Sequence, residues 1–445
     1  MSKSLFVSHG LLRALALAIC FAPSAPVGAQ FLLARITPPA PETEAEGTTR
    51  QVDVSADGRT LVFATEARNW FPGQLVGDSV IALDLGTGAF ESVARNGMGA
   101  ALNGNTFTPV ASGDGRYVAY TTAASNLGLG FATSGSHAVR KDRVTGALQL
   151  ASTSLIGMPA SGSASGQARE TSISADGRFV AFRSDAANLV GGDGNGADDL
   201  FVKDLDSGVI EAVSRDLGGA FTSAGVVYST SHAISGDGRY VVFQSGAGNL
   251  VPGVGSGTIR VYLRDRQNGV TELVSRNSAG EPAGSQSDNA SISPSGRFVA
   301  FRSFASNLGG SGGGLFVRDR VAGTTTPVPR PSLGGSLANG CRENDVSDVG
   351  SVIQSCFFPA PTKDQVYLHI PGASGTPFLV SSDVADVPGN DLSGASLAVD
   401  ASGFAMAFET LATNLIPPDA NGVSDVYAFV ELGFLNGIFA DGFED

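Results

Sequence analysis

Residues 175–189 read ADGRFVAFRSDAANL, and this phrase recurs along the chain. Close copies are GDGRYVAYTTAASNL at 113–127, GDGRYVVFQSGAGNL at 236–250 and PSGRFVAFRSFASNL at 294–308. More distant copies are ADGRTLVFATEARNW at 56–70, DVGSVIQSCFFPAP at 348–361 and ASGFAMAFETLATNL at 401–415. The glycines of the seven copies lie 53 to 62 residues apart, and six copies have Asn eleven residues after that glycine. A fixed pattern at this period indicates a repeat architecture.

Each repeat predicts four short strands. In the copy that starts at Ala175 they are ETSIS before Ala175, FVAFRS at 179–184, DLFVKDL at 199–205 and VIEAVSR at 209–215. The Asp–Gly pair between the first two suits a tight hairpin, because Gly adopts positive φ without a steric cost. No window shows an apolar period of 3.6 residues over helical length.

The repeats predict an all-β fold, a seven-bladed β-propeller of four-stranded antiparallel blades. One blade cannot bury both faces alone, so neighbouring blades must stack in a ring. An aromatic residue occupies one equivalent strand position in six copies, and we expect these side chains to form the core between blades. They are Phe63, Tyr120, Phe182, Phe243, Phe301 and Phe408.

The last copy predicts how the ring closes. Its first three strands are expected near 396–399, 404–409 and 425–430, and its fourth is unclear. FLLARIT at 31–37 precedes the first repeat and is the expected outer strand of the seventh blade, which removes an open sheet edge. The alternative is that FLNGIFADGF at 434–443 provides this strand.

The first 29 residues have the form of a cleavable secretory signal. Lys3 and Arg13 precede the apolar run ALALAICFA, and Val27 and Ala29 stand at the −3 and −1 positions. The apolar run is about half of the ~20 residues that a spanning helix needs. We therefore expect a signal peptide at 1–29, a propeller at 30–432 and a short tail at 433–445. The expected protein is periplasmic or secreted and has no membrane span.

Composition narrows the partners. The 445 residues include 28 Lys and Arg against 42 Asp and Glu, for a net charge of −14, with 42% hydrophobic residues and 59 Gly. The apolar fraction is typical of a globular protein. The acidic balance argues against nucleic acid, which requires clustered Lys and Arg. A monomer that binds a protein or a small ligand is the expectation.

Two cysteines, Cys341 and Cys356, follow the expected signal peptide, and two cysteines in an oxidising compartment suggest one disulfide. Cys341 lies eight residues before Val349 and Cys356 seven after it, at the turn between the first two strands of the sixth copy. Opposed residues of an antiparallel pair are within reach of a disulfide. The alternative is a pair of buried free thiols.

These phrases resemble the PD40, or TolB-type, propeller repeat, a WD40-like family whose hallmark is Ser-Pro-Asp-Gly-Arg before an apolar strand. The matching segments are SPSGRFVAF from Ser293 and ISADGRFVAF from Ile173, and, for a third strand that ends in Asp before a Gly turn, DLFVKDLDSG from Asp199 and VYLRDRQNG from Val261. The resemblance covers Ser55 to Val430 and implies a fold rather than an activity. TolB also has an N-terminal α/β domain, for which this chain has no room. The ending GIFADGFED resembles Gly-Phe-Glu endings of some secreted Gram-negative proteins.

Signals for catalysis are few, and no catalytic or cofactor-binding residue is predicted. Only His137, His232 and His369 follow the signal, and such scattered histidines are usually packed or on the surface. Gly309-Gly-Ser311-Gly-Gly313 has the spacing of a hydrolase motif but no following helix, which predicts a loop. Acidic residues from different blades can meet in a propeller, although no spacing selects a pair.

Two loops suggest a hard cation. Both contain D-x-N-G followed by Asp, and alternating oxygen ligands with a Gly at the bend suit Ca²⁺. The alternative is a hairpin loop in which Asp and Asn bond their own backbone. The candidate calcium ligands are Asp193, Asn195 and Asp199, and Asp419, Asn421 and Asp425.

A further repeated feature is a set of arginines directly after the turns, which could ring an anion. Their place in the repeat favours a structural role. They are Arg59, Arg116, Arg178, Arg239 and Arg297.

Three functions remain in play. The expected one is an exported, non-enzymatic binding scaffold. The alternatives are a hydrolase or lyase with acidic residues around the channel, and a calcium-stabilised surface protein. A channel lined by glycine and apolar side chains favours binding. Buried acids that converge with a His or a metal favour an enzyme.

Overall fold

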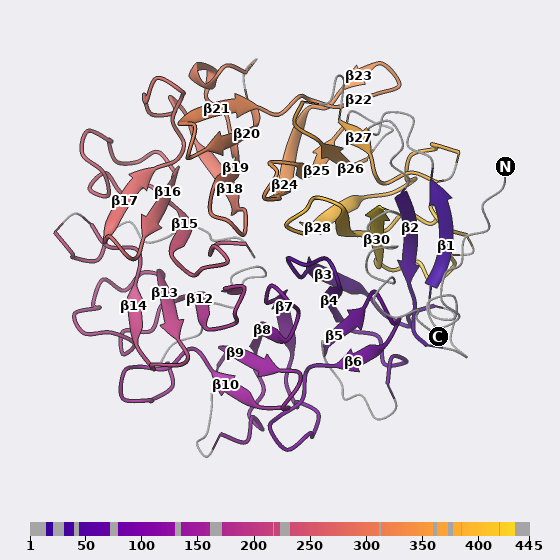
Figure 1. The fold of residues 1–445 in the computed structure, drawn as a ribbon, viewed down its shortest axis with the longest axis horizontal. Helices are drawn as coiled ribbons and strands as arrows, with labels where there is room; N and C mark the ends of the chain where they lie inside the picture. Colours follow the sequence, from indigo (N-terminus) through magenta and orange to yellow (C-terminus); the bar gives the residue numbers. More distant parts are fainter. Residues whose placement is uncertain are drawn as a thin grey trace, which may run out of the picture.

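The computed structural model describes residues 15–20, 31–39, 44–71, 79–129, 135–160, 171–216, 218–222, 232–310, 313–358, 363–372, 377–383, 385–417 and 419–431. Within these residues the protein is an all-β propeller of seven antiparallel blades around a central axis (Figure 1). The expected fold class is confirmed. No helix in the described part of the chain is long and apolar enough to cross a membrane.

The first four strands of the sequence repeat form one blade, from the axis outward. Blade 1 comprises β3 (Thr49–Val54), β4 (Thr60–Thr65), β5 (Ser79–Asp84) and β6 (Phe90–Ser92). Blade 2 comprises β7 (Thr106–Ala111), β8 (Tyr117–Thr122), β9 (His137–Asp142) and β10 (Leu148–Leu150). Blade 3 comprises β11 (Thr171–Ile173), β12 (Phe179–Ser184), β13 (Asp199–Asp204) and β14 (Ile210–Ala212).

Blade 4 comprises β15 (Tyr240–Ser245), β16 (Arg260–Asp265) and β17 (Val270–Leu273), and its innermost position is an isolated bridge between Ile234 and Val241. Blade 5 comprises β18 (Ser287–Ile292), β19 (Phe298–Ser303), β20 (Gly314–Asp319) and β21 (Thr324–Pro327), with a 3-10 turn at Ser306–Leu308. A short ribbon of β22 (Ser332–Leu333) and β23 (Ser336–Leu337) precedes blade 6, which comprises β24 (Gly340–Val346), β25 (Val352–Phe357), β26 (Gln365–His369) and β27 (Phe378–Leu379).

Blade 7 joins the two ends of the chain. It comprises β28 (Ser393–Val399), β29 (Ala405–Thr410), β30 (Asp425–Glu431) and, as the fourth strand, β2 (Phe31–Ile36). β2 pairs antiparallel with β30, from Phe31↔Glu431 to Arg35↔Tyr427, which confirms closure by the N-terminal strand. The alternative strand at 434–443 lies outside the described residues.

A fifth strand, β1 (Leu15–Cys20), pairs antiparallel with the outer edge of β2 and lies beside it in Figure 1. This segment is the apolar run of the expected signal peptide. If the signal is removed, β2 becomes the outer strand of blade 7. The expected cleavage point after Ala29 lies outside the described residues.

The turn between the first two strands of a blade shows why the repeated residues recur. In blade 3 the Ser174 hydroxyl donates to Asp176 Oδ1 at 2.5 Å, and the same carboxylate accepts the Arg178 N–H at 2.9 Å. Gly177 has φ 72°, and a Cβ there would collide with the ring of Tyr117 from blade 2. The Asp–Gly pair therefore serves both the turn and the close approach of the neighbouring blade.

The repeated Asn ties two loops together. Asn307 donates from Nδ2 to the Pro282 carbonyl at 2.9 Å and accepts the Gly284 N–H at 2.9 Å, so it links the loop after β19 to the loop before β18. Asn126 and Asn414 make the same type of link, to Ala101 and Pro388. The fixed offset in the sequence thus reflects a shared contact on one face of the ring.

The core lies between blades rather than within them. The described residues form seven apolar clusters, each made of two neighbouring blades. Phe243 of β15, for example, packs with Leu200 and Val202 of β13. The repeated aromatic residues are all buried within these clusters, as expected. β2 contributes to two of them, with Leu32 facing the blade 1 side and Leu33 the blade 6 side.

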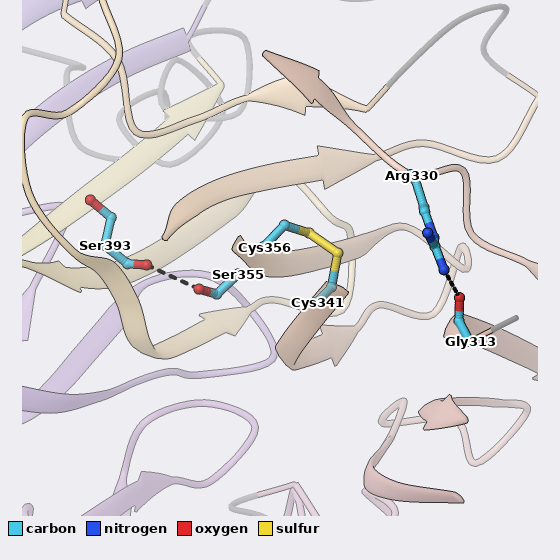
Figure 2. Close-up of a disulfide and its surroundings, with 6 residues drawn as sticks. All are labelled: Gly313, Arg330, Cys341, Ser355, Cys356 and Ser393. Atoms are coloured by element: carbon cyan, nitrogen blue, oxygen red, sulfur yellow. Dashed lines mark hydrogen bonds between the residues drawn. A yellow bond between two sulfur atoms is a disulfide. The ribbon is translucent and has the colours of Figure 1, made fainter. Parts of the chain in front are cut away.

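Blade 6 contains the expected disulfide. Cys341 of β24 and Cys356 of β25 are directly opposed, with Cα atoms 3.9 Å apart, and are bonded through sulfur (Figure 2). The strands shift register between Cys341 and Asn344. This β-bulge takes up the unequal number of residues on the two sides of the turn.

Candidate functional site

One end of the central channel is closed by backbone. The turns between the first two strands of successive blades bond to one another, beginning with Asp57 N–H to Gly113 O at 2.9 Å, Gly113 N–H to Ala175 O at 2.9 Å and Ala175 N–H to Gly236 O at 2.8 Å. The series continues through Pro294, Asp348 and Ala401 and returns to Ala56. Between blades 5 and 6 the Ser295 N–H bonds the Asp348 side chain at 2.6 Å instead. Small residues and this ring of hydrogen bonds leave little passage along the axis.

Above this ring lies a cavity of about 50 Å³. Its walls come from all seven blades and are mostly small or aliphatic. The lining residues include Val54, Ala111, Ile173, Ile234, Ile292 and Val399, together with His232 and Asp345. Small-molecule pockets usually measure ~300–1,000 Å³. The cavity therefore holds a few water molecules rather than a substrate.

The one charged group of atoms in this wall is a histidine between two carboxylates. His232 of blade 4 places Nε2 2.6 Å from Asp53 Oδ1 on β3 and Nδ1 2.8 Å from Asp345 Oδ1 on β24. Both aspartates are buried, and 23% of the His232 side-chain surface is exposed. The histidine thus connects blades 1, 4 and 6 across the axis.

The remaining oxygens of both aspartates are also bonded. Asp53 Oδ2 accepts the Ala111 N–H of blade 2 at 2.7 Å, and Asp345 Oδ2 accepts the Val399 N–H of blade 7 at 2.9 Å. Burial disfavours the charged imidazole, but Asp345 and Asp53 outweigh this effect and raise the pKa of His232 well above its usual value. The three groups compensate one another, and neither ring nitrogen is left to act as a base.

Sequence reasoning missed this cluster, because His232 looked like one of three scattered histidines. A signal did exist. Asp53 and Asp345 occupy the same repeat position, two residues before the turn serine or its neighbour, where the other copies have Val110, Ser172, Ala233, Ser291 and Ala398. Two acids at an axis-facing position that is otherwise small or apolar indicate a shared cationic partner.

The other candidate catalytic residues do not join this cluster. His137 is buried in blade 2 beside the Ser152 hydroxyl, 3.2 Å away, and burial lowers the pKa of His369 at the end of β26. Ser311 of the Gly-rich loop lies outside the described residues. No additional group in the described wall of the cavity supplies a second acid–base pair.

The arginines after the turns are used within their own blades. Arg178 binds Asp204 at the end of β13 in a bidentate pair, with N–O distances of 2.9 and 2.6 Å. This contact lowers the pKa of Asp204 well below its usual range. The same pairs occur as Arg116–Asp142, Arg239–Asp265 and Arg297–Asp319. These geometries account for the repeated Arg and the repeated third-strand Asp without an anion.

In the first candidate calcium loop, the Asn side chain serves the loop itself. Asn195 Nδ2 donates to Asp199 Oδ2 at 2.8 Å and to the Thr222 carbonyl at 3.1 Å, and its Oδ1 accepts the Ala197 N–H at 3.0 Å. Burial raises the pKa of both Asp193 and Asp199. The amide nitrogen, not the oxygen, therefore faces the carboxylate.

The second loop has the same Asn arrangement and also holds a cation of the protein. Arg35 of β2 lies 3.4 Å from Asp419 and 3.7 Å from Asp425, and Asn421 Oδ1 accepts the Val423 N–H at 3.1 Å. Burial, with Asp419 nearby, raises the pKa of Asp425 to about 7. No group of three or more His, Cys, Asp or Glu in metal-binding geometry occurs among the described residues. Calcium at either loop stays a prediction, which a calcium titration followed by thermal melting would test.

No family model and no curated protein matches this chain. Solved structures match it at low identity. TolB from Acinetobacter baumannii is 16% identical, with a TM-score of 0.40, and the match covers 75% of this chain and 63% of that chain. The β-propeller domain of the Trilobed protease from Pyrococcus furiosus is 12% identical, with a TM-score of 0.37 and coverage of 74% and 95%. A prolyl endopeptidase is 13% identical, with a TM-score of 0.46 and coverage of 91% and 55%. The present chain thus spans less than two thirds of the TolB and prolyl endopeptidase chains.

Proposed function

We propose that this protein is an exported, non-enzymatic propeller scaffold that binds a protein or a small ligand in the cell envelope or outside the cell. The disulfide between Cys341 and Cys356 suits an oxidising compartment, and the first 29 residues suit export. The PD40 resemblance is compatible with this role and does not specify the ligand.

The observation that carries the proposal is the state of the channel. Its cavity is about 50 Å³, and its histidine is bonded to a carboxylate on each side. A general base needs a free nitrogen within reach of the substrate proton. Because the channel offers neither such a nitrogen nor room for a substrate, we assign its polar groups to structure and look to the two faces of the ring for binding.

The two faces differ in what they expose. One consists of the turns inside each pair of first and second, or third and fourth, strands, and it carries the Arg–Asp pairs. The other consists of the longer loops and includes the exposed apolar residues Ile156 and Met158 after β10, which are 85% and 57% exposed. Exposed apolar clusters are typical of contact surfaces.

A hydrolase or lyase is the second candidate, and one observation favours it. Two buried acids and a histidine do converge in the channel, as an enzyme of this type would require. The bonds to all these groups and the small cavity weigh against it.

The experiment places a photo-crosslinking amino acid on each face of the chain that starts at residue 30, at Ile156 on the loop face or at Val321 on the turn face. Both side chains are largely exposed, so the substitutions form a matched pair. Incubation with envelope extract should give a saturable adduct from one face only, which unlabelled protein suppresses. Equal, unsaturable labelling from both faces contradicts a binding scaffold. Turnover of model peptides or glycosides that His232→Gln abolishes supports the enzyme instead.

A further inference from the structure

His232 lies where four blades depend on a single residue. Its side chain reaches Asp53 of blade 1 and Asp345 of blade 6, and its carbonyl accepts the Ile292 N–H of blade 5 at 3.0 Å. Blade 4, to which it belongs, has only the Ile234–Val241 bridge at its innermost position. The side chain therefore supplies a tie that the sheet of blade 4 does not.

We propose that His232 is a pH-sensitive clasp that holds blades 1, 4 and 6 together across the channel. The inference concerns regulation of the ring and is independent of the ligand. Blade-to-blade contacts elsewhere join neighbours, whereas this contact spans the axis.

The geometry alone requires the protonated ring. A neutral imidazole has one N–H donor and one acceptor nitrogen, whereas the imidazolium has two donors. Here both nitrogens lie within 2.8 Å of a carboxylate oxygen. In the neutral state, one carboxylate would face a lone pair at hydrogen-bond distance, and that contact would become repulsive.

The charges that face the ring are limited to these two aspartates. The strands packed around it contribute apolar side chains at this level, namely Ala111 from β7, Ile173 from β11, Ile292 from β18 and Val399 from β28. In the described wall of the cavity no other titratable group faces His232. Salt screens such an enclosed contact less than a surface pair.

The direction of the pH effect follows from the raised pKa of His232. A free histidine has a pKa of about 6.5. The stabilisation is therefore complete below about pH 6.5 and is lost as the pH rises from there through the higher pKa of the folded protein. His369, whose pKa burial lowers, acts in the opposite sense, because its contribution is lost as the pH falls.

The test compares thermal melting of wild type, His232→Gln and His369→Gln from about pH 5.5 to about pH 9.5. Asp425 also titrates near neutral pH, so each variant is read as its difference from wild type at the same pH. The Tm advantage of wild type over His232→Gln should be constant below about pH 6.5 and shrink above it. His369→Gln should keep the alkaline decline of wild type.

A second variant keeps the test decisive if His232→Gln does not fold. Asp345→Asn preserves volume and removes one carboxylate, so the alkaline decline should begin at lower pH than in wild type. Two results overturn the proposal: a Tm difference for His232→Gln that is independent of pH, or an alkaline decline that Asp345→Asn leaves in place.

Discussion

In blade 5 the hydroxyls of Ser287 and Ser303 face each other across β18 and β19, with their oxygens 2.8 Å apart. In blade 6 the same repeat position holds Cys341 and Cys356, joined as a disulfide. Blades 1 and 7 also have hydroxyl pairs there, Thr49 with Thr65 and Ser393 with Thr410. The comparison shows that one position of the blade, next to the bulge of the inner strand, is built for a cross-strand tie.

Blade 6 has also lost the other polar contacts of the repeat. Blade 5 has Arg297 bonded to Asp319 and Asn307 bonded to the preceding loop. Blade 6 has Ser351 directly after its turn glycine and Pro361 in place of the Asn, and Pro361 lies outside the described residues. A covalent tie thus stands in the blade that has drifted furthest from the repeat.

The largest effect is expected where neither kind of tie holds the blade, at the closure of blade 7. Deletion of β2 removes Phe31, Leu32, Leu33 and Ile36 from two interblade clusters. At ~1.5–3 kcal/mol for each large apolar side chain, the loss matches the 5–15 kcal/mol total of a typical protein. Thermal melting should show a sharply lower Tm, whereas a chain that starts at residue 30 should melt as one unit. An unchanged melt would mean that another segment closes the ring.

The next effect concerns the disulfide itself. Converting Cys341 and Cys356 to Ser gives blade 6 the hydroxyl pair of blade 5. The bond spans a sequence separation of 15 residues, for which loss of the crosslink costs about 3 kcal/mol. Urea denaturation should show this loss, and reduced wild type should shift in the same direction. Two reactive thiols in unreduced, unfolded wild type would show that the bond does not form.

The reverse exchange sharpens the comparison. Changing Ser287 and Ser303 to Cys should create a second disulfide in blade 5, because the two positions are directly opposed. The gain should be at most about 3 kcal/mol, reduced by any strain. Denaturant midpoints with and without reductant measure it. Failure of the thiols to oxidise would mean that the two blades differ in backbone geometry at this position.

The smallest effect is removal of one hydroxyl. Ser287→Ala leaves Ser303 with other partners, the Gln286 carbonyl and the Ala305 N–H. The free energy of unfolding should fall by about 1 kcal/mol. A loss as large as that of the disulfide would contradict the ranking of the two ties.

The repeat made most of the fold predictable. The expected segment 179–184 is β12, and the expected N-terminal strand forms β2, because strand period, Asp–Gly turns and repeat offset all point to the same arrangement. The disulfide also followed from opposed positions. The bulge that sets its register did not, because the residue in excess shows only when the two strands are paired.

The channel cluster was harder to predict for a physical reason. Asp53 and His232 are 179 residues apart and come from opposite sides of the ring, so no local spacing connects them. The two calcium loops show the reverse case. Their local pattern suggested a metal, but the neighbouring Arg35 and the use of each Asn amide by its own loop depend on tertiary contacts.

The protonation state of His232 tests most directly whether the channel is a closed structural axis rather than an active site. With histidine labelled by ¹⁵N, the ring nitrogens of His232 can be followed by NMR from about pH 6 to about pH 9, and His232→Gln assigns the signals. The account predicts that both nitrogens carry protons at neutral pH and that the titration midpoint lies well above that of a free histidine. A neutral ring at pH 7, with one unprotonated nitrogen facing the cavity, would contradict it and favour the enzyme.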